Sequence, residues 1–160
     1  MKHISAIISY LRTTPPIQNV VPDHEYNMLG KIVMRFLVKP VTPTIQNIEP
    51  DTTAAYGKYL AYNVMNCNGC HTKRGSTGEF IGEPLAGGYS WDLEDATYTS
   101  ANLTTDDSTG TISTWSQKVF IQRFRAGRVL QNSPMPWDAY QILSEHDLKA
   151  LYKFLNQLPA

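Results

Sequence analysis

The chain is organised around the stretch Cys67-Asn68-Gly69-Cys70-His71. Two cysteines separated by two residues, with a histidine directly after the second, are the pattern of a c-type haem attachment site. Each thiol adds to one vinyl group of the haem, and one turn of backbone holds the two sulfurs at the distance between those groups. The stretch therefore predicts one covalently bound haem, with His71 beside the iron as an axial ligand.

Two other uses of a cysteine pair stay open from this motif alone, a zinc site and a redox-active dithiol. Structural zinc takes four ligands, whereas the chain has 2 cysteines and no downstream histidine pair at ligand spacing. A thioredoxin-type dithiol needs a βαβ setting, which the surrounding sequence does not predict. Haem attachment is the favoured interpretation, and a methionine further along the chain strengthens it.

Several further motifs resemble those of class I cytochromes c, and more closely the haem domains of dehydrogenase-linked and multi-haem cytochrome c subunits. The resemblance covers Asp51 to Ala160. It rests on CNGCH at Cys67 to His71, NLT at Asn102 to Thr104, TGTISTWS at Thr109 to Ser116, PMPW at Pro134 to Trp137 and LSEHDLKALYKFL at Leu143 to Leu155. It implies an all-α cytochrome c fold, in which a few helices and long loops wrap around one haem.

Met135 is the predicted second iron ligand. It lies between two prolines, and a loop restrained in this way suits a weak thioether ligand that must be held in place. Met65 is too close to Cys67 in the sequence to reach the opposite face of the haem, and His146 is expected in an exposed first turn of the last helix. Ligation by His71 and Met135 would raise the reduction potential and leave no open position on the iron.

The resemblance also implies residues that support the haem and its ligands. The Pro84 carbonyl is expected to accept a hydrogen bond from the His71 ring, which fixes the imidazole and raises its basicity. Asn102 and Trp115 are expected near the haem propionates. The glycine-rich segment from Thr72 to Ser90 is expected to form a loop along the haem edge, because loops of this length usually wrap something.

Helical periodicity predicts helices from about Thr52 to Asn66, from Trp115 to Ala126 and near the C-terminus. Gly57 lies inside the first of these, although glycine in a helix costs roughly 1 kcal/mol relative to alanine. In the resembled family, a glycine here lets the C-terminal helix cross closely, so we expect the first and last helices to cross at Gly57. The candidate N-caps are Ser113 or Thr114 for the second helix and Ser144 for the last.

The residues before the haem domain show a second pattern. Ile4 to Leu11 aligns with Leu148 to Leu155, and the apolar positions coincide. Such a repeat suggests that the chain begins in the last helix of a preceding cytochrome-like domain. Periodic apolar residues also predict a short helix from Tyr26 to Val38. The expected boundaries are 1–15 for the remnant helix, 16–50 for a proline-rich linker with this short helix, and 51–160 for a mono-haem cytochrome c domain.

Composition and hydropathy limit the partners and the location. The chain has 14 basic and 14 acidic side chains, which excludes the strongly basic surface of a nucleic-acid-binding domain. The apolar run from Ile32 to Val38 is interrupted by Arg35 and is far shorter than the roughly 20 residues of a membrane span. Haem attachment in the resembled family takes place outside the cytoplasm, which implies a periplasmic or otherwise extracytoplasmic location. The segment from Met1 to Leu11 nevertheless lacks the cleavage site of a secretory signal.

These expectations favour one-electron transfer, with dehydrogenases, oxidases or other cytochromes as redox partners and no substrate chemistry in this domain. Two alternatives stay open. A haem-based gas sensor or a peroxidase-like domain would need an open position on the iron, and a purely structural haem would react with no redox partner. Binding of carbon monoxide to the reduced protein distinguishes the first alternative from electron transfer.

Overall fold

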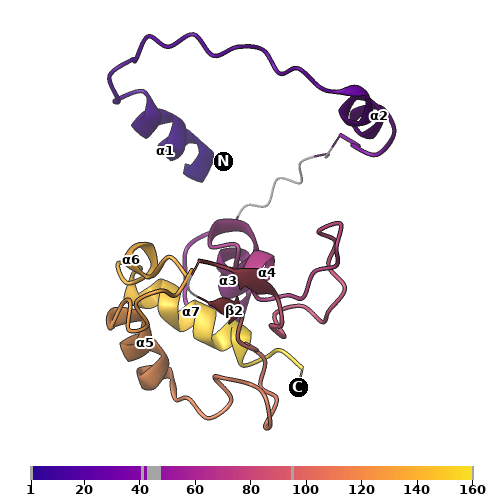
Figure 1. Ribbon diagram of the computed structural model, residues 1–160. Helices are drawn as coiled ribbons and strands as arrows, with labels where there is room; N and C mark the ends of the chain where they lie inside the picture. The colour runs from indigo at the N-terminus through magenta and orange to yellow at the C-terminus, as the bar shows by residue number, and fades with distance from the viewer. Residues whose placement is uncertain (1, 41, 43–47, 95, 160) are drawn as a thin grey trace. The chain divides into compact units, whose positions relative to one another are not determined.

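The computed structural model describes residues 2–40, 42, 48–94 and 96–159 (Figure 1). The chain divides into two compact units, Met1–Asn47 and Ile48–Ala160, which are described separately below. Within the part of the chain that is described, no helix combines the length and the apolar character that crossing a bilayer requires.

The first unit contains two helices among its described residues. α1 spans Lys2–Leu11 and α2 spans Met28–Phe36. The side chain of Asn27 caps α2 by accepting a hydrogen bond from the Gly30 backbone at 2.7 Å, which satisfies one of the unpaired amides of its first turn. α2 confirms the helix predicted around Tyr26 to Val38, and none of its residues is buried.

The second unit carries most of the regular structure. Its elements are α3 (Ala54–Tyr59), the π-helical turn η1 (Leu60–Val64), α4 (Cys67–Cys70), β1 (Ser90–Asp92), β2 (Thr97–Thr99), α5 (Gln117–Arg125), α6 (Trp137–Tyr140) and α7 (Glu145–Leu155). The prediction of an all-α fold is right for the main elements, but it missed the antiparallel pair β1–β2. Strands of three residues are too short to show a period-2 pattern.

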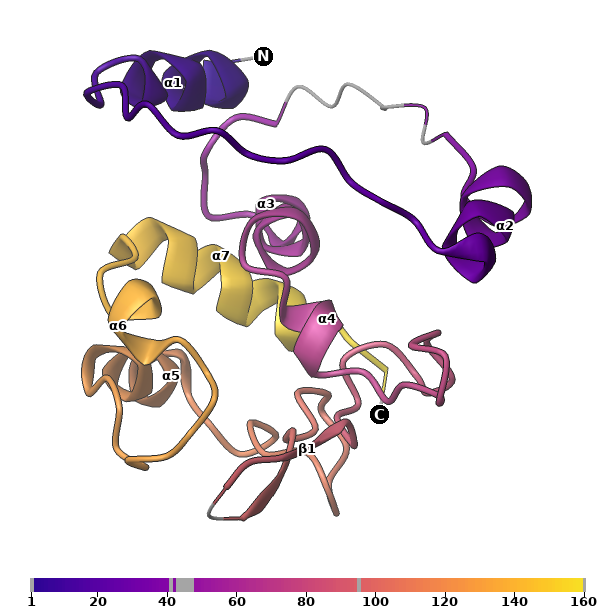
Figure 2. The ribbon, with the colours of Figure 1, turned by 45° about the horizontal axis from the view of Figure 1, so that its top comes forward.

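The contact between α3 and α7 holds the second unit together (Figure 2). A Cβ atom built on Gly57 would lie 2.0 Å from the carbonyl oxygen of Ala150, so the two backbones approach as closely as glycine allows. The prediction that the first and last helices of the domain cross at Gly57 is confirmed. Ser144, the predicted N-cap of the last helix, caps α7 and forms a capping box with Asp147.

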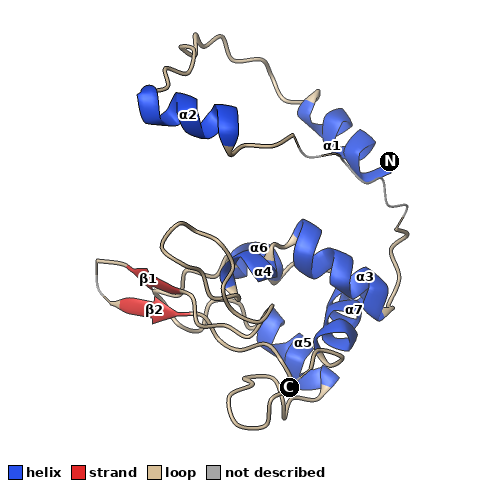
Figure 3. Cartoon of the chain, turned by 90° about the vertical axis from the view of Figure 1, so that its right-hand side faces the viewer, coloured by secondary structure: helices blue, strands red, loops and turns tan. Residues whose placement is uncertain are grey.

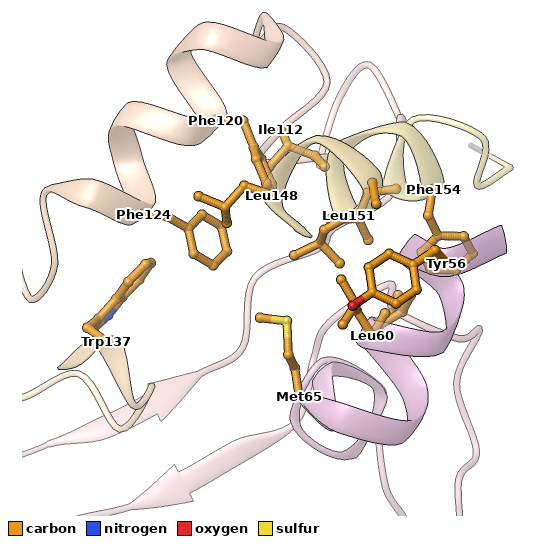
Figure 4. Packing of buried hydrophobic residues seen from close by; sticks show 14 residues of the cluster. Tyr56, Leu60, Met65, Ile112, Phe120, Phe124, Trp137, Leu148, Leu151 and Phe154 are labelled. Carbon is orange, nitrogen blue, oxygen red and sulfur yellow. The ribbon is translucent and has the colours of Figure 1, made fainter. Parts of the chain in front are cut away.

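The hydrophobic core joins this crossing to α5 and α6 (Figure 4). Leu60 of η1 packs with Leu151 and Phe154 of α7 in the same buried cluster. At the other end, Phe124 of α5 lies edge to face against Trp137 of α6, with 5.8 Å between the ring centroids. The core therefore fixes α3, α5, α6 and α7 relative to one another, and with them the ends of the long loops that connect these helices.

α5 begins slightly later than the periodicity predicts. Its cap is Ser116 rather than Ser113 or Thr114, because the Ser116 hydroxyl accepts a hydrogen bond from the Val119 backbone at 3.3 Å. Gly127 follows the helix in the left-handed region, with φ of 64°, which agrees with the predicted end of the helix at Ala126. The late start leaves Trp115 in the segment before the helix.

Candidate functional site

The cysteines and the histidine of the motif lie on one short helical turn. Asn66, in the left-handed conformation with φ of 53°, is the N-cap of α4 and turns the chain from η1 into it. Asparagine adopts this conformation more readily than most residues do. The His71 amide donates to the Cys67 carbonyl at 2.7 Å, so the histidine follows directly on the turn that presents the two thiols.

This turn opens onto a cavity of about 490 Å³ inside the second unit. That volume lies in the range of small-molecule and cofactor sites. The hairpin β1–β2 and its flanking loops lie on one side of the unit, and α3, α5 and α7 on the other (Figure 3). The lining is mostly apolar and aromatic; it includes Trp91, Tyr98, Leu103, Ile112, Trp115, Phe120, Phe124, Trp137, Leu151 and Leu155.

The His71 ring has a fixed orientation in the cavity wall. Its Nδ1 lies 2.8 Å from the Ala101 carbonyl oxygen, which can only accept, so Nδ1 carries the proton and Nε2 keeps its lone pair. Burial lowers the pKa of His71, and the hydrogen bond to Ala101 opposes this shift in part. A neutral, oriented imidazole with a free Nε2 is the form that binds a metal ion.

The structure corrects the prediction for Pro84, which does not accept the hydrogen bond from the His71 ring. Pro84 is exposed and is not among the described residues that line the cavity. The next residue, Leu85, is fully buried instead, and its carbonyl accepts a hydrogen bond from the Leu103 amide at 2.8 Å. This bond holds the segment after β2 against the turn at Pro84 and brings the Ala101 carbonyl to the ring.

Met135 reaches the cavity from the loop between α5 and α6. The Ser133 hydroxyl accepts hydrogen bonds from the Met135 amide at 3.4 Å and from the Trp137 indole at 3.2 Å. Arg128 donates to the Ser133 carbonyl and pairs with Asp138 at 3.6 Å. The loop is thus held by its own hydrogen bonds and by the Arg128–Asp138 pair, and Met135 lies in the cavity wall.

A direct link joins this region to the attachment motif. The Tyr140 hydroxyl of α6 donates to the Met65 carbonyl at 2.7 Å, just before Cys67. Burial raises the pKa of Tyr140 to about 12, so the hydroxyl remains a donor throughout the neutral range. This bond ties the segment that carries Met135 to the one that carries His71, and Tyr140 itself lines the cavity.

Met65 and His146, the competing ligands considered from the sequence, do not line the cavity. Among the described residues, Met65 is buried in the core without lining the cavity, and His146 is exposed on the first turn of α7. Of the donors considered, Met135 is the one that lies in the wall together with His71.

The two residues predicted near the propionates differ in position. Trp115 lines the cavity, whereas Asn102 is not among the described lining residues. The Asn102 amide group donates to the Thr109 hydroxyl at 2.9 Å and accepts from the Thr104 backbone at 2.8 Å. The Asn102 side chain therefore stabilises the loop from Asn102 to Thr109, and its neighbours Ala101 and Leu103 line the cavity.

Sequence reasoning missed several contributors to the site. The Ala101 carbonyl gives no signal, because any residue has one. Trp91 and Tyr98 face each other across the hairpin and both line the cavity, but they stand in strands too short to predict. Arg123 also lines it, and helical spacing could have found this residue, because it follows Phe120 by three positions on the apolar face of α5.

The donor set fits a covalent haem. Cys67 and Cys70 are free thiols, and burial raises the pKa of the Cys67 thiol to about 12. Two thiols on one turn, an oriented imidazole and a thioether share one largely apolar cavity. This combination matches two thioether bonds and two axial ligands of a haem iron better than the tetrahedral set of a structural metal.

Comparison with known proteins gives matches over the second unit and beyond. The family described as cytochrome c matches residues 54–159. The chain is 34% identical over 109 residues to the gluconate 2-dehydrogenase cytochrome c subunit of Pantoea cypripedii, covering 65% of this chain and 23% of that protein. It is 32% identical over 120 residues to the fructose dehydrogenase cytochrome subunit of Gluconobacter japonicus, covering 69% and 23%.

A third relative matches over more of the chain. The alignment to the cytochrome c subunit of the quinone alcohol dehydrogenase of Gluconobacter oxydans (strain 621H) is 27% identical over 158 residues, 90% of this chain and 33% of that protein. The chain therefore spans about a quarter to a third of the length of these curated relatives.

Proposed function

Because the chain belongs to the cytochrome c family, we propose that its second unit is a mono-haem electron-transfer domain. In this proposal Cys67 and Cys70 hold the haem covalently, and His71 and Met135 are the axial ligands. The observation that carries the proposal is that these four side chains line one cavity, although Met135 is far from the motif in sequence. No catalytic residue is assigned, because the domain transfers electrons without substrate chemistry.

The residues of the chain have separate roles around this group. When bound, the haem supplies a one-electron iron couple. The Ala101 carbonyl keeps the His71 ring in its ligating tautomer, and Ser133 holds the loop of Met135. The aromatic and aliphatic wall excludes water, and Trp115, a lining residue, would lie beside a haem propionate. Ligand type and burial together set the reduction potential.

The relatives suggest the kind of partner. They are named as cytochrome subunits of dehydrogenases for gluconate, fructose and alcohol. We infer that this domain accepts electrons from a dehydrogenase subunit and passes them to a further redox protein. A periplasmic or otherwise extracytoplasmic location fits this role, and the parent protein can carry a membrane anchor elsewhere.

Haem staining after denaturing electrophoresis tests the attachment. The wild-type band should keep its colour, and the double variant Cys67→Ala, Cys70→Ala should lose it, because no thioether bond can form. The native protein should then titrate reversibly as a one-electron couple. Colourless wild-type protein would overturn the proposal, and tight binding of carbon monoxide to the reduced wild type would favour a gas sensor or a peroxidase-like domain instead.

A further inference from the structure

Arg123 is the exceptional side chain in the cavity wall. Among the described residues that line the cavity, it alone carries a permanent charge, and no aspartate or glutamate is present in that lining. The groups around it are aromatic: Phe120 and Phe124 lie on the same face of α5 and are buried. A lone cation in such a wall is weakly screened compared with one in water.

The guanidinium is held in place by two contacts. Its Nη1 donates to the Gly127 carbonyl at 2.8 Å, and its central carbon lies 3.7 Å from the centroid of the Trp137 ring. This second contact is a stacked cation–π interaction. The Trp137 indole also donates a hydrogen bond to the Ser133 hydroxyl. The Arg123 guanidinium is therefore linked, through Trp137, to the loop that carries Met135.

The neighbouring arginines are used differently. Arg128 pairs with Asp138 at 3.6 Å, so its charge is compensated in part. Arg125 donates to the Gln141 carbonyl and is exposed on α5. Loss of hydration on burial lowers the pKa of Arg123, and none of the described residues that line the cavity is a carboxylate. Its positive charge therefore acts on whatever group occupies the cavity.

One-electron reduction of a bound haem removes one unit of positive charge from the site. A fixed cation in the wall disfavours the more positive ferric state and so favours reduction. We propose that Arg123 raises the reduction potential of the haem held in this cavity through its charge. This inference rests on the proposed function, because it needs a redox-active haem in the site.

The variant Arg123→Gln tests the charge. We expect it to lower the equilibrium constant for reduction by on the order of tenfold, which corresponds to 59 mV for a one-electron couple. The variant Arg123→Lys keeps the charge without the planar stack on Trp137, and its equilibrium constant should stay within about threefold of wild type. Lys118→Gln is the matched control, since it removes an exposed charge from the same helix and should change nothing.

The outcomes distinguish this inference from the function on which it rests. Arg123→Gln with covalent haem, an unchanged ligand spectrum and the wild-type potential would overturn the role of Arg123 while leaving electron transfer intact. If Arg123→Gln and Arg123→Lys lower the equilibrium constant for reduction equally, the role of the Arg123 charge is also overturned. The stacking on Trp137 would then matter rather than the charge. If Arg123→Gln does not retain haem, the test rests on Arg123→Lys. A tenfold lower equilibrium constant for reduction in Arg123→Lys would then contradict the inference. Colourless wild-type protein would instead refute the proposed function.

Discussion

Met135 enters the cavity from a loop whose order comes from Ser133 and from the Arg128–Asp138 pair. We predict that Met135→Ala keeps covalent haem but lowers the reduction potential by roughly 100 to 300 mV, part of the roughly 0.8 V range that axial ligands set. The thioether favours the ferrous state, and its loss opens a position on the iron. Redox titration and carbon monoxide binding measure the two effects.

Met28→Ala is the control for this change, because Met28 is 81% exposed and belongs to the first unit. It should leave the spectrum and the potential as they are. If Met135→Ala also leaves them unchanged, Met135 is not the axial ligand and that part of the proposal fails.

Asp106 gives the site a pH-dependent support. Its carboxylate accepts hydrogen bonds from the Thr109 hydroxyl at 2.7 Å and the Ser108 hydroxyl at 2.8 Å, and these bonds lower its pKa to about 2. A carboxyl with a lowered pKa in the folded state stabilises the fold above its unfolded value of 3.8, and this contribution is lost as the pH falls towards 2. Asp106→Ala should therefore lower the melting temperature at pH 7.

The difference in melting temperature between wild type and Asp106→Ala should shrink as the pH falls from 4 towards 2. In that range the Asp106 carboxylate of the wild type becomes protonated and loses the same hydrogen bonds. Thermal melts at several pH values check this, with the exposed neighbour Asp107→Ala as the control. A deficit that stays constant across that range would show that the loop does not depend on the ionised carboxylate.

Residues with a distinctive functional group could be predicted from the sequence, and residues that act through the backbone could not. The attachment spacing and the proline-flanked Met135 already point to one shared site, and the fold brings them together in one cavity. The predicted partner of His71 was wrong because a carbonyl at Ala101 looks like any other in the sequence. Its position depends on the contact between Leu85 and Leu103, which no local pattern reveals.

At the scale of the elements, the α3–α7 crossing at Gly57 positions the attachment motif. Gly57→Ala would gain about 1 kcal/mol of helix propensity. The added methyl group would lie 2.0 Å from the Ala150 carbonyl oxygen, and overpacking of this kind costs about 3 kcal/mol. The clash outweighs the gain, so we expect a net loss of about 2 kcal/mol in the free energy of unfolding, measured by denaturant titration of the haem-loaded protein.

Gly30→Ala is the matched control for Gly57→Ala. It is also a helical glycine, but the added methyl group meets no atom closer than 3.3 Å. It should leave the unfolding of the second unit unchanged. Equal stabilities of Gly57→Ala and wild type would show that α3 and α7 can separate without cost, against the close packing observed.

The limits of element prediction have a physical origin. The helix expected from Thr52 to Asn66 is present, but it changes from α3 to the π-helical turn η1 at Leu60. There the Met65 amide reaches the Leu60 carbonyl at 2.8 Å. Five-residue spacing of this kind depends on tertiary packing and leaves no periodic signal. The same holds for the hairpin β1–β2, whose short strands depend on the loops beside it.

At the scale of the whole molecule, α1 repeats the buried face of α7. The positions buried in α7 are Leu148, Ala150, Leu151, Phe154 and Leu155, and they align with Ile4, Ala6, Ile7, Tyr10 and Leu11. Ala6 falls on Ala150, the residue that meets Gly57 at the crossing. We propose that α1 is the last helix of a preceding cytochrome-like domain and that its apolar face packs on a glycine-bearing helix of that domain.

The remaining prediction concerns this apolar face. Ile4, Ile7 and Leu11 are 64%, 58% and 59% exposed, and burial is worth roughly 25 cal/mol per Å² of apolar surface. Deleting residues 1–16 should therefore leave the haem spectrum and potential intact while changing the stability or the oligomeric state, measured by thermal melts and sedimentation. Ile4→Asp with Ile7→Asp should act like the deletion, whereas Ser5→Asp, on the polar side, should not. Loss of haem incorporation on deletion would contradict the proposal, because α1 would then belong to the haem fold itself.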